Sequence, residues 1–207
     1  MKSVRAKYIS AFAALVLGMS LVATDAGATA KVGEKAPEFE LVDTNGKSHK
    51  LSSFAGKTVV LEWFNKGCPY VQKHYESQNM QALQKKYTDK GVVWLTVISS
   101  APGKQGFEDN QQANKTRADW KIASTATLLD PKGEVGKLYA AKTTPHMYIV
   151  DAKGTLVYNG AIDSISSSKK DDVAKAENYV AGALDLLAGG QPIKTGTPKP
   201  YGCSVKY

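Results

Sequence analysis

The chain has 207 residues, 43% of them hydrophobic, and carries a formal charge of +8 from 27 basic and 19 acidic side chains. This length is sufficient for one domain with a sizeable core. The positive charge does not indicate a nucleic-acid-binding protein, because it comes from scattered lysines and only Arg5 and Arg117 are arginines. We interpret it as a solvated surface and expect no nucleic-acid partner.

The first thirty residues have the pattern of a signal peptide. Basic residues near the N-terminus precede an apolar stretch at 9–23, and small residues offer cleavage sites after Ala28 and Ala30. A retained membrane anchor is the alternative, which the short and interrupted apolar stretch disfavours. We expect residues 1–30 to be cleaved on export, most simply to the periplasm, and no membrane contact of the mature chain.

The mature chain begins with a predicted hairpin. Residues 39–42 alternate as a strand does, Asn45-Gly46 is a strong two-residue turn, and a short helical turn follows at 51–56. We expect His49 to lie at the surface.

Residues 59–64 are apolar or aromatic except for Glu62, which predicts a strand buried on both faces. A turn follows, and Pro69 suits the first position of a helix. Cys68 therefore falls at a helix N-terminus, where free N–H groups and the helix dipole favour an anion. We expect this position and the neighbouring Lys66 to lower the thiol pKa from its ordinary value of about 8.5 and make Cys68 reactive. A buried, inert cysteine is the alternative.

The residues after Cys68 predict a single long helix at 69–90, with Lys73 and Gln84 on its polar face and His74 at the surface. The next apolar run, 92–98, predicts a second buried strand. Strand, helix and strand in this order indicate a parallel crossover.

The rest of the domain alternates helices and strands. We predict helices at 107–119, 134–141 and 169–187, and strands at 127–129, 147–150 and 156–160. Residues 191–207 are rich in proline and predict an irregular tail that carries Cys203. Cys68 and Cys203 are the only cysteines, and in an oxidising compartment we expect them to pair.

The segment from the strand at 59–64 to Cys68 resembles the active site of the thioredoxin-like superfamily, where a central strand leads into W-C-x-x-C. Cys68 matches the first cysteine of that motif, and Val71 stands in place of the second. The G-C-P-Y-V motif and the opening A-P-x-F-x-L motif are similar to those of a peroxiredoxin-like branch of this superfamily. That branch is of the AhpC/TSA or redoxin type and has a single active-site cysteine.

The resemblance implies an α/β, thioredoxin-like fold with a central mixed sheet flanked by helices. It divides the chain into a signal peptide at 1–30, a redoxin domain at 31–190 with an N-terminal hairpin extension, and a tail at 191–207.

The same resemblance implies roles for residues near Cys68. Glu62 matches a buried acid that handles the proton of the thiol chemistry, although a salt-bridged structural role is equally compatible with the residues alone. Thr144 and Pro145 match a cis-proline loop, whose backbone pairs with a substrate chain beside the active-site sulfur. Lys66 and Pro69 border the same place. We expect no metal and no cofactor.

Three functions remain open. In the first, Cys68 attacks a disulfide and Cys203 resolves the mixed disulfide. In the second, Cys68 reduces hydroperoxides. In the third, the protein is a non-enzymatic binder of a metal or protein partner, with a structural Cys68–Cys203 disulfide. Peroxiredoxins polarise the peroxide with a threonine and an arginine, and Asn65 and Pro145 stand in those places here. We therefore predict an exported, antioxidant oxidoreductase that acts on a disulfide-bearing protein or a small oxidant and is re-reduced by a thiol donor.

Overall fold

A computed structural model of the protein describes residues 29–193 and 197–207. Nearly all of the predicted signal peptide lies outside the described residues. Within the described ranges, no helix is both long enough and apolar enough to cross a membrane.

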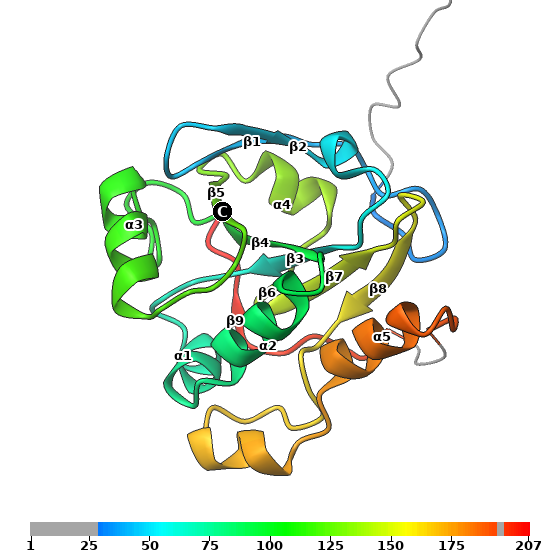
Figure 1. The fold of residues 1–207 in the computed structure, drawn as a ribbon. Coiled ribbons are helices and arrows are strands. Elements are labelled where there is room, and N and C mark those ends of the chain that lie inside the picture. The colour runs from blue at the N-terminus through cyan, green and yellow to red at the C-terminus, as the bar shows by residue number, and fades with distance from the viewer. Residues whose placement is uncertain (1–28, 194–196) are drawn as a thin grey trace, which may run out of the picture.

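A seven-stranded mixed sheet forms the centre of the fold (Figure 1), with the order β2-β1-β5-β4-β3-β7-β8. Its strands are β1 (Glu40–Asp43), β2 (Ser48–Lys50), β3 (Val59–Trp63), β4 (Val93–Ile98), β5 (Ala126–Leu129), β7 (His146–Val150) and β8 (Leu156–Gly160). The pairs β3–β4 and β4–β5 are parallel, and the other neighbours are antiparallel. The predicted mixed sheet, with an N-terminal hairpin at one edge, is confirmed.

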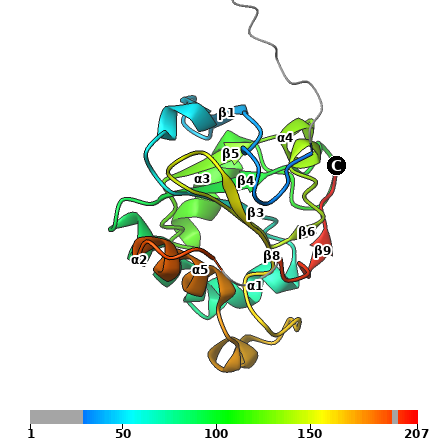
Figure 2. The same ribbon diagram turned by 90° about the vertical axis from the view of Figure 1, so that its right-hand side faces the viewer.

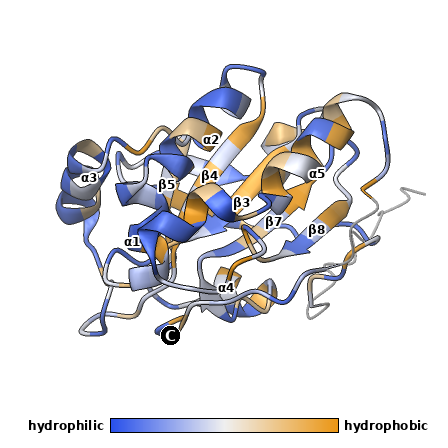
Figure 3. Cartoon of the chain, turned by 90° about the horizontal axis from the view of Figure 1, so that it is seen from below, coloured by the Kyte–Doolittle hydropathy of each residue, from blue (hydrophilic) through white to orange (hydrophobic). Residues whose placement is uncertain are grey.

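Helices cover both faces of this sheet (Figures 1 and 2). They are α1 (Pro69–Glu76), α2 (Asn79–Thr88), α3 (Asn110–Asp119), α4 (Glu134–Leu138) and α5 (Tyr179–Ala188), with 3-10 turns η1 (Leu51–Phe54) and η2 (Lys170–Lys175). Alternate residues of β3 supply the two cores: Val60 packs with α1, α2 and α5, and Leu61 packs on the face of α4. Because both faces are covered, β3, β4 and β7 are buried throughout and largely hydrophobic (Figure 3).

The single helix predicted for 69–90 is wrong. The structure has two helices there, and Gln78 between them adopts a left-handed conformation with φ of 62°. Lys73 and Gln84, predicted on a polar face, are both buried. Their polar ends are satisfied inside the protein: Lys73 Nζ donates to the carbonyl of Ile165 at 2.9 Å, and Gln84 Nε2 donates to a buried carboxylate.

The helix predicted for 169–187 is likewise divided, into η2 and α5. Asn178 explains the later start of α5, because its side chain accepts a hydrogen bond from the backbone N–H of Ala181 at 2.9 Å and caps the helix. The helix predicted for 107–119 begins only at Asn110, where Asp109 and Gln112 form a capping box.

The C-terminal tail is more ordered than predicted. Its strand β9 (Cys203–Ser204) pairs antiparallel with β6 (Thr143–Thr144) in a small sheet apart from the main one, visible beside α1 in Figure 2. Before β9, the Pro198 carbonyl accepts the Ala161 N–H at 3.0 Å, and after it the Tyr207 hydroxyl donates to the Ala141 carbonyl at 2.8 Å. The tail is therefore docked on the domain on both sides of Cys203.

The break between α1 and α2 gives a testable prediction. A non-glycine residue in the left-handed region costs about 1 kcal/mol, so Gln78→Gly should leave the free energy of unfolding unchanged or raise it by up to that amount. Ala82→Gly, at an exposed position inside α2, should instead lower it by about 1 kcal/mol. Urea unfolding measures both, and equal losses in the two variants would contradict the assignment.

Candidate functional site

Cys68 lies where β3 gives way to α1. It is the residue before the first helical position, which Pro69 occupies, and its carbonyl accepts the N–H groups of Val71 and Gln72 at 2.9 Å. The predicted strand, turn and helix around this cysteine are confirmed. The sulfur therefore sits beside the positive end of a helix.

The turn before Cys68 is held by the loop at 105–108. Gln105 donates its side-chain amide to the Gly67 carbonyl at 2.9 Å, and Lys66 Nζ lies 2.9 Å from a carboxylate oxygen of Glu108, whose side chain is fully buried. We expected Lys66 to act on the sulfur of Cys68. In the structure its charge is paired with Glu108 instead, because a buried carboxylate requires a partner.

The sulfur of Cys68 is completely buried, and its S–H group donates to the carbonyl oxygen of Thr144 at 2.9 Å. A carbonyl oxygen only accepts, so this bond forms only while the sulfur carries its proton. The reactive cysteine expected at the helix N-terminus is therefore enclosed in this structure, and its sulfur is in contact with the Thr144 carbonyl.

The tail supplies the other side of this closed site. The Thr144–Pro145 peptide is cis, as predicted, and Cys203 is the direct partner of Thr144 in the pairing of β9 with β6. Burial, and then the neighbouring Cys68 side chain, raise the pKa of Cys203 to about 11, so Cys203 is a thiol at neutral pH. No disulfide joins the two cysteines here, and their pairing stays a prediction.

Glu62 is the buried acid of β3. It is completely buried, and it accepts hydrogen bonds from the hydroxyl of Tyr75 at 2.7 Å, the indole of Trp94 at 2.8 Å and the amide of Gln84 at 3.0 Å. Burial raises the pKa of Glu62, against the lowering effect of these donors. The salt-bridged role open at the sequence level is not what the structure shows, since all three partners are neutral.

The sequence did not reveal a second group of polar residues, around Tyr201. The Tyr201 hydroxyl donates to Asp163 and lies 3.3 Å from Nε2 of His74, and Lys73 Nζ lies 4.9 Å from the ring centroid. His74 was predicted at the surface but is fully buried, and burial, then the charge of Lys73, lower its pKa to about 3. His74 lies three residues after Val71, whose side chain is buried, so both side chains lie on the same face of the helix. This spacing is the sequence signal that indicates burial of His74.

His49 was also predicted at the surface and is also buried. Its Nε2 lies 2.8 Å from a carboxylate oxygen of Asp43, and its ring stacks on Phe54. This pair fastens the N-terminal hairpin and lies in β1 and β2, apart from the cysteines.

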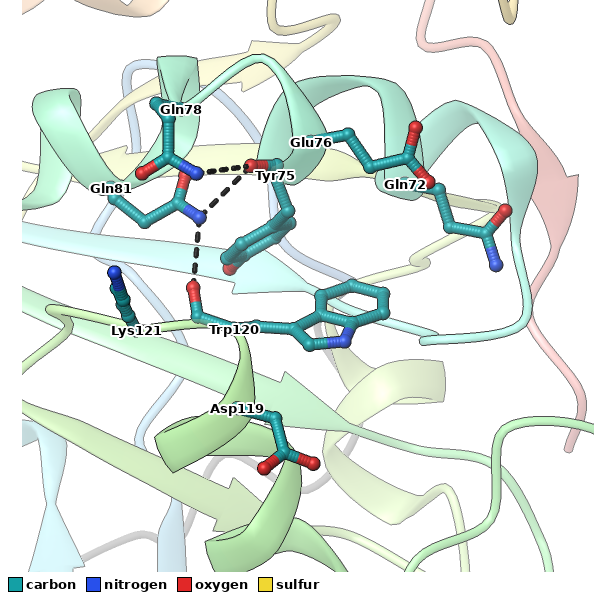
Figure 4. Close-up of a pocket in the computed structure, with 8 residues that line it drawn as sticks. All are labelled: Gln72, Tyr75, Glu76, Gln78, Gln81, Asp119, Trp120 and Lys121. Atoms are coloured by element: carbon teal, nitrogen blue, oxygen red, sulfur yellow. Dashed lines mark hydrogen bonds between the residues drawn. The ribbon is translucent and has the colours of Figure 1, made fainter.

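The two thiols do not line the hollow between α1 and α2. That hollow, of about 360 Å³, lies between α1, α2 and the end of α3 (Figure 4). Gln81 crosses it, donating to the carbonyls of Tyr75 at 3.0 Å and Trp120 at 2.8 Å. Neither cysteine and no residue of β6 lines it. Across the described residues, no group of three or more His, Cys, Asp or Glu side chains is arranged to hold a metal ion.

Known proteins share this fold. An uncharacterized conserved protein from Geobacillus kaustophilus superposes with a TM-score of 0.72 at 24% identity, over 86% of this chain and 92% of its own. A hypothetical protein from Sinorhizobium meliloti 1021 gives a TM-score of 0.72 at 20% identity, over 87% and 96%. In sequence, the thiol-disulfide oxidoreductase ResA of Bacillus thuringiensis subsp. konkukian (strain 97-27) is 26% identical over 127 residues, 61% of this chain and 68% of that protein.

The fold and these relatives define a class, the thioredoxin-like oxidoreductases that work through thiols and disulfides. Within that class the chain belongs to the AhpC/TSA family, which matches residues 32–159. The resemblance noted from the sequence is thereby confirmed. The match ends well before the tail that carries Cys203.

His146, next to Pro145, gives a prediction on pH. Its ring is buried, with Nε2 2.7 Å from Asn159 Oδ1, and burial lowers its pKa from 6.5 to about 4. Between these values the unfolded chain binds a proton that the folded chain does not, so His146 costs stability as the pH falls. The free energy of unfolding of the wild type, relative to that of His146→Gln, should decrease by up to about 1.4 kcal/mol for each unit by which the pH falls. Urea unfolding at about pH 6 and about pH 5 measures this gap, and a constant gap contradicts it.

Proposed function

We propose that the protein is an exported thiol–disulfide oxidoreductase in which Cys68 is the attacking thiol and Cys203 the resolving thiol. The family and the ResA relatives support the general activity. The assignment of roles rests on one observation: the Thr144 carbonyl accepts the S–H of Cys68, while Cys203 pairs with that same residue. The C-x-x-C motif lacks its second cysteine, and the pairing of Cys203 with Thr144 supports the tail cysteine as its substitute.

The reaction proceeds by two exchanges. The Cys68 thiolate attacks one sulfur of a substrate disulfide, forming a mixed disulfide and releasing the first substrate thiol. The Cys203 thiolate then attacks the Cys68 sulfur, releasing the second substrate thiol and closing a Cys68–Cys203 disulfide. The substrate gains two electrons and two protons, and the protein loses them. A separate dithiol donor returns the protein to the reduced state.

The position of each cysteine favours this order. Cys68 lies at the start of α1, where the helix dipole stabilises a thiolate once the bond to Thr144 opens. Cys203 has a raised pKa and stays protonated until a mixed disulfide changes its surroundings. Glu62 is assigned as the group that exchanges protons with this site. Thr144 and Pro145 are assigned to the substrate chain, and Lys66 and Pro69 to the border of its binding site.

Hydroperoxide is the second candidate oxidant, favoured by membership of the AhpC/TSA family. It would oxidise Cys68 to a sulfenic acid, which Cys203 then converts to the disulfide with loss of water. The absence of the threonine and arginine described above favours disulfides over peroxides. Arg117, the one arginine among the described residues, donates instead to Ser124 and Thr127.

The cysteines test the proposal directly. Cys68→Ser should abolish reduction of a model disulfide, and Cys203→Ser should react once and accumulate a mixed disulfide, because the resolving thiol is missing. Mass spectrometry of the intact protein under non-reducing conditions distinguishes these states. Unchanged turnover in Cys68→Ser, or a Cys68–Cys203 bridge that never opens with a dithiol, would support the non-enzymatic alternative.

Glu62 has a test of its own. Glu62→Gln keeps the shape of the side chain but cannot exchange protons, so the rate of disulfide exchange should fall and its pH profile should lose one inflection. Stopped-flow measurement from about pH 5 to about pH 8 shows both effects. A profile identical to that of the wild type would leave Glu62 with a structural role only.

A further inference from the structure

Three buried polar side chains that the exchange reaction does not use meet at Tyr201, two residues before Cys203. The Tyr201 hydroxyl donates to Asp163 Oδ1 and lies 3.3 Å from His74 Nε2. Lys73 Nζ lies 4.9 Å from the Tyr201 ring centroid and 3.7 Å from Asp163 Oδ2. The side chains of Lys73 and His74 are fully buried, and that of Asp163 is 2% exposed. We name these three residues the tyrosine socket.

Binding an aromatic ring in the tyrosine socket costs more desolvation free energy than binding it in an apolar pocket. Burying Lys73 and Asp163 removes two charges from water, and an apolar pocket would anchor a ring without that cost. Unlike an apolar pocket, the socket also recognises the Tyr201 hydroxyl group, because the charged carboxylate of Asp163 accepts its hydrogen bond. The ring of Tyr70 in α1 makes an edge-on contact with the ring of Tyr201, with the two ring centroids 5.8 Å apart. This contact fixes the plane of the Tyr201 ring. The socket therefore accepts Tyr201 in one position.

Gly202 fixes the next position of the tail. It has φ of +133°, and a Cβ atom added to it would lie 2.1 Å from the carbonyl oxygen of Thr144. No residue with a side chain fits there without moving the tail. With Tyr201 in the socket and Gly202 against Thr144, Cys203 is left opposite Thr144 and beside Cys68. A slip of one residue would turn Cys203 to the other face of β9.

We propose that Tyr201 is a positioning residue, which sets the register of β9 on β6 through the tyrosine socket and so delivers Cys203 to Cys68. This inference rests on the exchange function proposed above. It assigns Lys73, His74 and Asp163 to the second exchange, the attack of Cys203 on the Cys68 mixed disulfide, and not to the first. Neither step needs any group of the socket to react.

Tyr201→Phe in the full chain tests the inference, because it removes the hydroxyl and keeps the ring. The matched control is Tyr207→Phe, which removes the hydroxyl of the tail's other tyrosine, a hydroxyl that donates to the Ala141 carbonyl. Each reduced protein is mixed with excess oxidised glutathione, quenched with acid and analysed by mass spectrometry. In Tyr201→Phe we expect the glutathione adduct on Cys68 to accumulate and the Cys68–Cys203 disulfide to close about tenfold more slowly, since a hydrogen bond to a charged group is lost. Formation of the adduct should not slow.

Gly202→Ala is the second variant, since it leaves the tyrosine socket whole and displaces the strand by its methyl group. It should slow closure in the same way. Closure at the wild-type rate in both Tyr201→Phe and Gly202→Ala overturns the inference, and so does an equal loss in Tyr207→Phe, which would indicate general loosening of the tail. If the wild type itself forms no Cys68–Cys203 disulfide, the proposed function fails instead, and the two failures are distinguished.

Discussion

The hydrogen bond from the Cys68 thiol to the Thr144 carbonyl joins three parts of the chain that are far apart in sequence. It links the start of α1, the loop that contains the cis peptide, and, through the pairing of Thr144 with Cys203, the C-terminal tail. Two influences act on the sulfur at this point: the helix N-terminus favours an anion, and the carbonyl oxygen requires a proton. Both influences act on a sulfur that is completely buried in this structure.

The closed structure also determines what can approach Cys68. In the thioredoxin-like resemblance, a substrate chain pairs with the backbone beside the cis proline. Here β9 of the same chain occupies that edge of β6. If the proposed function holds, the tail has two consequences for this site, because it carries the second thiol and also occupies the edge assigned to a substrate backbone. Under that proposal, a protein disulfide would require β9 to leave this edge before it could reach the sulfur, and a small oxidant would require a smaller displacement.

Features that depend on neighbouring residues could be predicted from the sequence. The strand before Cys68, the helix after it, the hairpin at Asn45-Gly46 and the loop of Pro145 all have local signals, and the structure contains them. The break at Gln78 could not be predicted, because glutamine has no preference for the left-handed conformation that it adopts there. Propensity indicates an unbroken helix, and tertiary packing divides it.

The tyrosine socket could not be predicted from the sequence for a different reason. His74 and Tyr201 are 127 positions apart, and a lone histidine in a polar helix has the composition of a solvated surface. The tail was predicted to be irregular since its prolines disfavour regular structure, and two residues of strand are too short to produce a pattern. Only the arrangement in space shows that Gly202 lies against Thr144 because a larger residue would collide there.

The place of β9 at the far end of the chain affects how the protein is made. Chains grow from the N-terminus, and domains begin to fold during synthesis. All seven strands of the main sheet precede β9 in the sequence, so this sheet can form before Cys203 has been added. Until β9 is present, the edge of β6 beside the cis peptide lacks the strand that pairs with it in the complete structure.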